Sequence, residues 1–178
     1  TPVVLSGSTI NLTVNSTKGA YTVDVEGNDP ANPYSLTIGS DNTATTIVAS
    51  APSATGNSYG LANYASGAAV GTSVANKLTV NGTSLDLSLQ GGTGATEGVY
   101  STTGAITTIA TKSTNITVTG SGETYGILTN NLGNTTVSSD TINISATGGV
   151  ITSAVSAEGA KATVPGTYNL RNVSTVIT

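Results

Sequence analysis

Apolar and polar residues alternate along most of the chain. Near the start, Ile10, Leu12 and Val14 occupy every second position, and Asn11 and Thr13 lie between them. Successive side chains of a β-strand point to opposite faces, so this alternation predicts a strand with one buried face. The pattern returns in "AYTVDVEG", "YSLTIG", "TTIVAS", "SLDLSLQ", "AITTIAT", "TNITVTG", "TYGILTN", "TINISATGG", "VITSAVS" and "TYNLRNVSTVIT". We therefore predict about twelve short strands separated by turns.

The fold class that follows is all-β. Thr, Val, Ile and Tyr favour strands, and the 22 glycines supply turns. Asn81 and Gly82 separate two alternating runs, a pattern typical of a two-residue hairpin turn. Short strands joined in this way predict a β-sandwich of the immunoglobulin-like or jelly-roll type.

A parallel β-solenoid is the alternative architecture. The segments "SYGLAN" and "TYGILT" are alike, and glycine-rich turns recur, as expected for stacked repeats. The spacings between similar segments are uneven, and no fixed period emerges. The sandwich is therefore the preferred prediction, and the solenoid stays open.

Composition and charge narrow the function. Only 8% of residues are charged and the net charge is −4, so the cluster of basic residues that nucleic-acid binding needs is absent. No apolar run approaches the ~20 residues of a membrane span. His and Cys are absent, which removes the usual catalytic bases, thiol nucleophiles and thiolate metal ligands. The nine carboxylates form no recognisable pair, so we expect neither an enzyme nor a cofactor.

The segment "DVEGNDP" is a weak candidate for a metal site. Asp24, Glu26, Asn28 and Asp29 offer hard oxygen ligands of the kind that calcium prefers. Their spacing differs from that of an EF-hand loop. We interpret Asp24 and Glu26 as an exposed strand face and Asn28 and Asp29 as the start of a turn, without a bound metal.

Seven triplets fit the N-glycosylation pattern N-x-[ST]. Several of their asparagines occupy polar positions of alternating segments, so we expect N-linked glycans on an extracellular protein. The asparagines are Asn11, Asn15, Asn81, Asn115, Asn134, Asn143 and Asn172.

The first sixteen residues form a nearly unbroken strand pattern that must pair with something. It can pair within its own chain, as the first strand of the sandwich. It can instead complete the sheet of a neighbouring copy, which is donor-strand complementation. We predict a donor strand over residues 1–16 and a single sandwich head over residues 17–178. The apolar residues that enter the neighbour's groove are Val3, Leu5, Ile10, Leu12 and Val14.

Repeated head to tail, this contact gives an open filament. The alternating start "VVLSGSTINLTV", the Thr-, Ser-, Asn- and Gly-rich composition and the glycosylation triplets resemble the subunits of archaeal thread filaments of thermoacidophiles. The resemblance implies a glycosylated extracellular subunit of a linear or helical homopolymer, secreted with a cleaved signal peptide and serving adhesion or biofilm formation. The alternative function is an adhesin passenger or surface-layer fragment that binds cells or surfaces.

Overall fold

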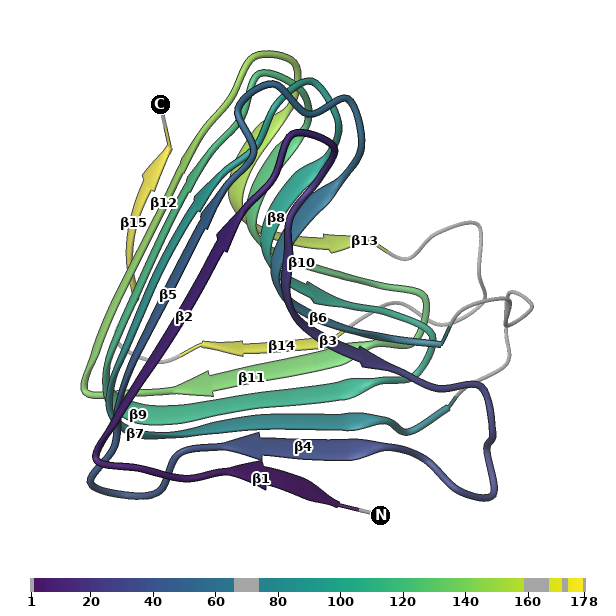
Figure 1. Cartoon of the computed structure of the whole chain (residues 1–178), viewed down its shortest axis with the longest axis vertical. Coiled ribbons are helices and arrows are strands. Elements are labelled where there is room, and N and C mark those ends of the chain that lie inside the picture. The colour runs from purple at the N-terminus through teal and green to yellow at the C-terminus, as the bar shows by residue number, and fades with distance from the viewer. Residues whose placement is uncertain (1, 66–73, 159–166, 171–172, 178) are drawn as a thin grey trace.

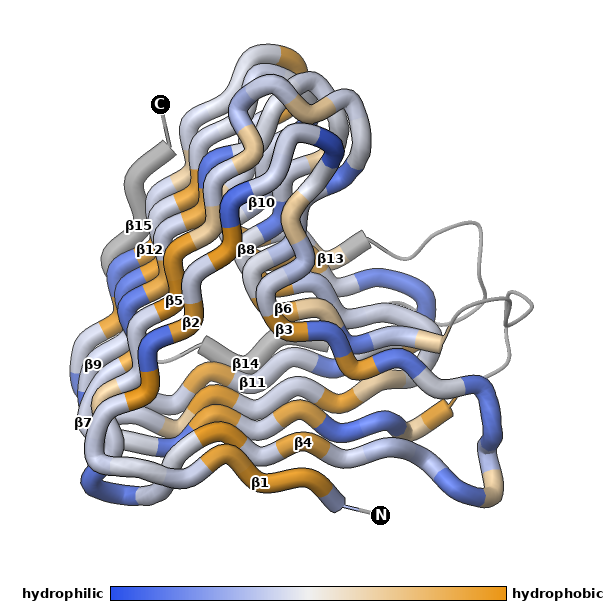
Figure 2. The backbone as a smooth tube through the Cα atoms, in the orientation of Figure 1, coloured by the Kyte–Doolittle hydropathy of each residue, from blue (hydrophilic) through white to orange (hydrophobic). Residues whose placement is uncertain are grey.

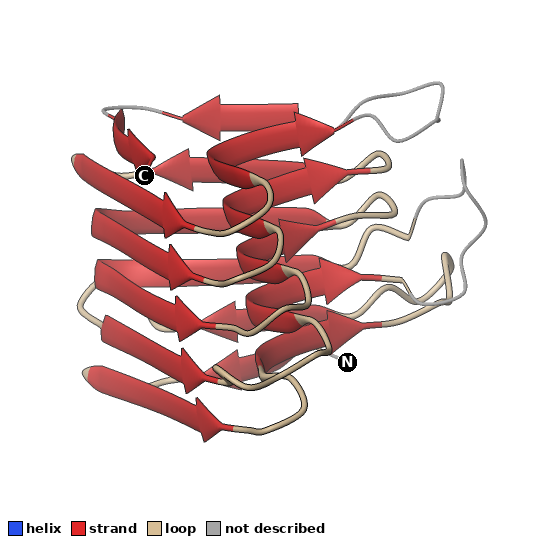
Figure 3. Cartoon of the chain, turned by 90° about the horizontal axis from the view of Figure 1, so that it is seen from above, coloured by secondary structure: helices blue, strands red, loops and turns tan. Residues whose placement is uncertain are grey.

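The strands wind into a three-sided coil, and successive coils stack on one another (Figure 1). The computed structural model describes residues 2–65, 74–158, 167–170 and 173–177. Within these residues there is no helix, and every strand pairing is parallel. The predicted all-β class is confirmed, and the coils form a parallel β-solenoid, whose stack is seen from the side in Figure 3.

Each side of the coil contributes one stack of strands. The first side holds β1 (Val3–Leu5), β4 (Ser35–Ile38), β11 (Asn134–Ser138) and β14 (Thr167–Leu170). The second side holds β2 (Thr9–Asn15), β5 (Ala44–Ser50), β12 (Thr141–Thr147) and β15 (Val173–Ile177). Two long strands, β7 (Lys77–Gln90) and β9 (Ile106–Thr119), turn the corner and belong to both sides. The third side is a separate sheet of β3 (Tyr21–Glu26), β6 (Ser58–Tyr64), β8 (Thr96–Ser101), β10 (Thr124–Asn130) and β13 (Thr152–Glu158).

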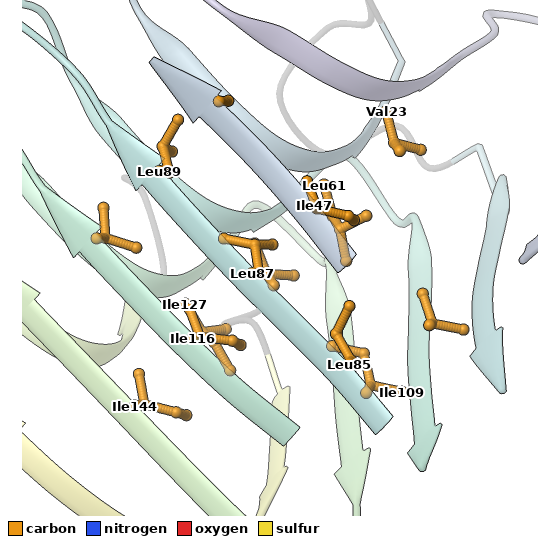
Figure 4. Packing of buried hydrophobic residues seen from close by; sticks show 14 of the residues in the cluster. Val23, Ile47, Leu61, Leu85, Leu87, Leu89, Ile109, Ile116, Ile127 and Ile144 are labelled. Atoms are coloured by element: carbon orange, nitrogen blue, oxygen red, sulfur yellow. The ribbon is translucent and has the colours of Figure 1, made fainter. Parts of the chain in front are cut away.

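The core is a set of apolar ladders that run through the coils. Hydrophobic and polar residues alternate along the strands of the second side (Figure 2), as the sequence predicts. Neighbouring parallel strands lie about 4.8 Å apart, so each inward side chain packs on its register partner in the next coil. One ladder on the second side is Leu12, Ile47, Leu87, Ile116 and Ile144. Facing it across the core, the third side contributes Val23, Leu61, Val99 and Ile127 (Figure 4).

The parallel pairing replaces the expected sandwich. Immunoglobulin-like and jelly-roll sandwiches pair their strands antiparallel. The predicted hairpin at Asn81 and Gly82 is wrong, because β7 continues through both residues and pairs in parallel with β9 along its length. The two residues instead form the corner between the first and second sides. A side chain at Gly82 would collide there with the carbonyl oxygen of Thr43.

The predicted donor segment lies on its own chain. β1 pairs with β4, and β2 pairs with β5, so residues 3–5 and 9–15 form two sides of the first coil. Ile10, Leu12 and Val14 pack against the core of this chain, whereas Val3 and Leu5 are exposed. This is the pairing at home that the sequence left open, and donation to a neighbour stays a prediction.

Glycines bring the third side close to the second. The register of every pairing in this sheet omits one position, occupied by Gly60 in β6, Gly98 in β8 and Gly126 in β10. A Cβ atom at Gly98 would lie 2.8 Å from Cγ2 of Ile116, on the second side, and 2.5 Å from the carbonyl oxygen of Gly126. The sheet bends inward at this level, which leaves its outer surface concave (Figure 1).

We call Gly60, Gly98 and Gly126 the glycine ladder, and their close packing leads to a prediction about stability. We expect Gly98→Ala to lower the free energy of unfolding by about 1–3 kcal/mol, because the added methyl group overpacks a close approach of two sheets. Gly7→Ala is the matched control, since the nearest atom to its Cβ, the carbonyl oxygen of Thr9, is 3.3 Å away. Urea unfolding followed by circular dichroism measures both. Equal stability of the two variants would contradict the close approach.

Candidate functional site

Tyrosine side chains gather on the outer surface of the third side. All seven aromatic residues of the chain are tyrosines. Five of them belong to strands β3, β6, β8 and β10 of this one sheet: Tyr21, Tyr59, Tyr64, Tyr100 and Tyr125. We call the outer surface of these four strands the tyrosine face; it also carries the exposed residues Asp24 and Glu26, and the buried Glu97 lies in the register row of Tyr59.

Stacking of the coils brings the rings into contact. The rings of Tyr21 and Tyr59 meet edge to face, with centroids 4.9 Å apart. Tyr59 stacks on Tyr100 at 5.1 Å, and Tyr64 lies 6.2 Å from Tyr100 in a tilted arrangement. Each such pair contributes about 0.5–1.5 kcal/mol beyond the area it buries. The contacts form a continuous aromatic cluster over three coils.

The position of Tyr21 differs from the expectation. Strict alternation places Tyr21 on the buried face with Val23 and Val25, yet its side chain is 47% exposed. The pairing of β3 with β6 omits Thr22 and Gly60, so the alternation changes phase there. Tyr21 therefore lies outward, on the same surface as Asp24.

Carboxylates give this surface a negative potential. The hydroxyl group of Tyr64 donates to Oδ2 of Asp24 at 3.3 Å and to Oε2 of Glu26 at 3.5 Å. Burial raises the pKa of Tyr64, and the charges of Asp24 and Glu26 raise it further. Burial and then the charge of Glu97 likewise raise the pKa of Tyr59. These tyrosines are therefore neutral donors and flat apolar surfaces at physiological pH.

The ionised carboxylate of Asp24 is disfavoured in the folded state. Its partial burial raises the pKa of its carboxyl group, and repulsion from Glu26 raises it further, whereas the hydrogen bond from Tyr64 lowers it. The fold thus holds two like charges close together on one strand.

A buried asparagine positions the rim of this surface. The Asn76 side chain is fully buried, and its Oδ1 accepts a hydrogen bond from the backbone N–H of Tyr34 at 2.9 Å. Its Nδ2 donates to the backbone carbonyls of Tyr64 at 2.9 Å and Gly27 at 3.0 Å. One amide therefore fixes the backbone at both tyrosines and at the glycine between β3 and β4.

A groove runs along this rim between β1, β3 and β4. It has a volume of about 230 Å³ and is lined by residues 24–26 of β3, residues 34–36 at β4, and Val3 of β1.

The weak metal candidates separate into two groups. Asp24 and Glu26 are exposed on β3, and Asp29 begins the following turn, as the sequence predicts. Oδ1 of Asp29 accepts from the backbone N–H of Ala31 at 2.9 Å, and its Oδ2 accepts from Asn32 at 2.8 Å. These hydrogen bonds, led by the one from Asn32, lower the pKa of Asp29. The described part of the chain contains no group of three or more carboxylates arranged for a metal ion.

The glycosylation triplets lie mainly away from the tyrosine face. Asn11, Asn15 and Asn143 are exposed on the second side, and Asn115 is half-buried beside them. Asn143 donates to Oδ1 of Asn115 at 2.9 Å, and Asn115 donates to Oδ1 of Asp86 at 2.7 Å. Of the remaining asparagines, Asn81 and Asn134 are half-buried on strands β7 and β11, and Asn172 lies outside the described residues.

Comparison with known proteins gives no relative: no protein-family model, no curated protein and no solved structure matches this chain. The described residues include no helix with the length and apolarity needed to cross a membrane. The class of the protein is therefore defined by its architecture, an all-β chain of parallel coils with a clustered aromatic surface.

The raised pKa of Asp24 predicts that the effect of this residue on stability depends on pH. Folding raises the pKa of Asp24, so its ionised form lowers stability above the folded pKa, and this penalty vanishes below the unfolded value of about 3.9. We expect Asp24→Asn to raise the melting temperature at pH 7 and to leave it unchanged at pH 3.

Thermal unfolding of the wild type and the variant at both pH values measures this difference. Asp140→Asn, which removes an exposed carboxylate from the corner between β11 and β12, is the control and should change the melting temperature little at pH 7. A gain from Asp24→Asn that persists at pH 3 would contradict the electrostatic origin.

Proposed function

We propose that the chain is an extracellular binding module in which a β-solenoid shaft presents the tyrosine face to a partner. The observation that carries the proposal is the cluster of four tyrosine rings on the third side, in which Tyr21 is exposed, Tyr64 and Tyr100 are half-buried, and Tyr59 is buried. Tyrosine is enriched at the centres of protein interfaces, because its ring buries a large area with little loss of side-chain freedom. This proposal follows the adhesin or surface-layer interpretation of the sequence.

The shape of the solenoid supports this function. Stacked repeats form extended surfaces whose curvature follows from the repeat, and such surfaces serve binding in many solenoid proteins. Here the inward bend of the third side makes its outer surface concave, and the rings lie over that surface in three successive coils. A partner that lies along the coil axis can contact the accessible rings, those of Tyr21, Tyr64 and Tyr100, at once.

N-linked glycans on the second side are compatible with this role. Asn11, Asn15 and Asn143 point to solvent from β2 and β12, on a different side of the coil from the tyrosine face. Asn115 and Asn143 are register partners on adjacent strands about 4.8 Å apart, so we propose that only one of them carries a glycan. The tyrosine face would stay uncovered.

Loss of the exposed rings tests the function. Fluorescently labelled protein is applied to an array of immobilised polysaccharides, glycoproteins and acidic and basic polypeptides. We expect Tyr21→Ala combined with Tyr64→Ala to weaken wild-type binding at least ~10-fold, the usual effect of removing interface anchors. Thr46→Ala combined with Thr117→Ala removes side chains of the second side as the control.

Two results would contradict the proposal. The first is equal binding by the tyrosine variant and the wild type. The second is the absence of wild-type binding across the whole array.

A filament subunit is the second candidate function. β1 and β2 pair on one side only and thus form an open edge of the first coil. Val3 and Val4 are more than half exposed, and β1 has only three residues, so this segment costs less to release than an inner strand. We propose that residues 1–16 then complete a neighbouring copy in a homopolymer, as in donor-strand filaments.

Removal of this segment tests the filament. We expect deletion of residues 1–16 to give a folded chain that stays monomeric in size-exclusion chromatography and forms no filaments in negative-stain electron microscopy. Leu12→Asp should likewise disrupt assembly, because an unpaired charge would enter the neighbour's groove. Filaments formed by the truncated chain would exclude donation by these residues.

A further inference from the structure

We infer that two copies of the chain pair through the edge of β2, in an antiparallel arrangement related by a two-fold axis at Leu12. This interface joins the first coils of the two copies and does not depend on binding by the tyrosine face. It also differs from strand donation, because β2 stays paired with β5 of its own chain while it binds the partner. The inference is carried by an open, uncharged strand edge together with incomplete burial of the core in the first coil.

β2 is an open edge that suits a further strand. Among the described strands it pairs with β5 alone, so its other edge presents backbone N–H and C=O groups to a partner. Its seven residues include no charged residue, proline or glycine, which are features that block edge pairing in many proteins. The other strands of the first coil are less suitable, because β1 has only three residues and β3 carries Asp24 and Glu26.

The core is incompletely covered at this end of the stack. Ile10, Leu12 and Val14 pack on the core of the chain, yet each is only half-buried. Their register partners in the next coil are at most 2% exposed; these are Thr45, Ile47 and Ala49. A strand added beside β2 therefore buries apolar surface that the chain itself leaves in contact with water, and this burial favours association.

The sequence of β2 is complementary to itself in the antiparallel direction. Residues that lie opposite each other in a strand pair share one face of the sheet, so apolar positions must meet apolar positions. With Leu12 opposite its own copy, Ile10 meets Val14 and Asn11 meets Thr13. All seven residues of the strand are then paired. This self-complementarity identifies a second copy as the partner.

The two-fold axis also determines what meets the rest of the first coil. β1 and β3 precede and follow β2 on either side of it, so the rotation brings β3 of each copy to the level of β1 of the other. β1 has no charged residue, so Asp24 and Glu26 are not brought against a like charge on that strand. The first coil, residues 3–26, is comparable in size to the roughly 20–30 residues per partner of a standard interface. Because such an interface is isologous, assembly closes at two copies.

Charges on the outer face of β2 test the pairing without entering the core. Asn11 and Thr13 are exposed and lie opposite each other in the inferred pair. We expect the wild type to be a dimer in sedimentation equilibrium. Asn11→Asp combined with Thr13→Asp should raise the dissociation constant of the dimer at least ~10-fold, because like charges then meet at two equivalent contacts. The protein is produced without glycans, since a glycan on Asn11 would lie at the contact.

Two further variants make the test specific. Asn11→Asp combined with Thr13→Lys places opposite charges at both contacts and should keep the dimer. Thr117→Asp combined with Thr119→Asp adds two negative charges to exposed positions of β9, an inner strand of the same side, and should change the dissociation constant less than twofold. Circular dichroism verifies that all variants are folded.

Three results would overturn the inference. The first is a monomeric wild type. The second is an equal loss of dimer in the two variants that gain only aspartates, or in the two variants of Asn11 and Thr13. The third is an open polymer of the wild type in place of a closed dimer, which would favour strand donation instead. Binding to the array is measured separately, so failure of the dimer leaves the proposed binding function intact.

Discussion

Stacking in register is the constraint on which the rest of the structure depends. Each strand pairs in parallel with the equivalent strand of the next coil, so every inward position faces its own equivalent about 4.8 Å away. An apolar residue at such a position is buried only if its partners are also apolar, which makes the core a set of ladders. The same rule acts on the outer surface, where it aligns Tyr21, Tyr59 and Glu97 in one row and joins Asp86, Asn115 and Asn143 by hydrogen bonds in another. Function in such a fold is therefore assembled from residues one coil apart.

The glycine ladder connects the core to the candidate site. Because Gly60, Gly98 and Gly126 have no side chain, the third sheet approaches the second and bends. The bend changes the phase of alternation, so Tyr21 joins Asp24 and Glu26 on the outer surface. The close approach of the third sheet to the second side and the concave shape of the tyrosine face therefore both result from the glycines of the glycine ladder.

The sequence predicted strands well because alternation depends only on local burial. The strand pattern around Ile10, Leu12 and Val14 is present in β2, and "SLDLSLQ" is present in β7. The architecture was harder to predict, because a half-buried strand alternates in the same way whether its partners are antiparallel or parallel. Register partners are 28 residues apart at Thr96, Thr124 and Thr152, whereas the earlier partners Tyr21 and Tyr59, and Ser58 and Thr96, are 38 residues apart, so the period changes along the chain. Asn81 and Gly82 mimic a hairpin because a solenoid corner and a tight turn both need backbone freedom.

The sequence could predict only part of the candidate site, because some of its residues are placed by alternation along one strand and others by pairing between coils. Asp24 and Glu26 are two residues apart, so their exposure on one strand face followed from alternation. Their partner Tyr64 comes from the following coil, as does Asn76, which bonds to the backbone of Gly27, and only the register places both beside β3. The electrostatics then argue for a role beyond stability. Most inward polar groups in this chain are neutral hydroxyls and amides, whereas Asp24 and Glu26 repel each other where the fold gains little from them. A carboxyl group whose pKa is raised by partial burial and by a neighbouring carboxylate marks a candidate functional site.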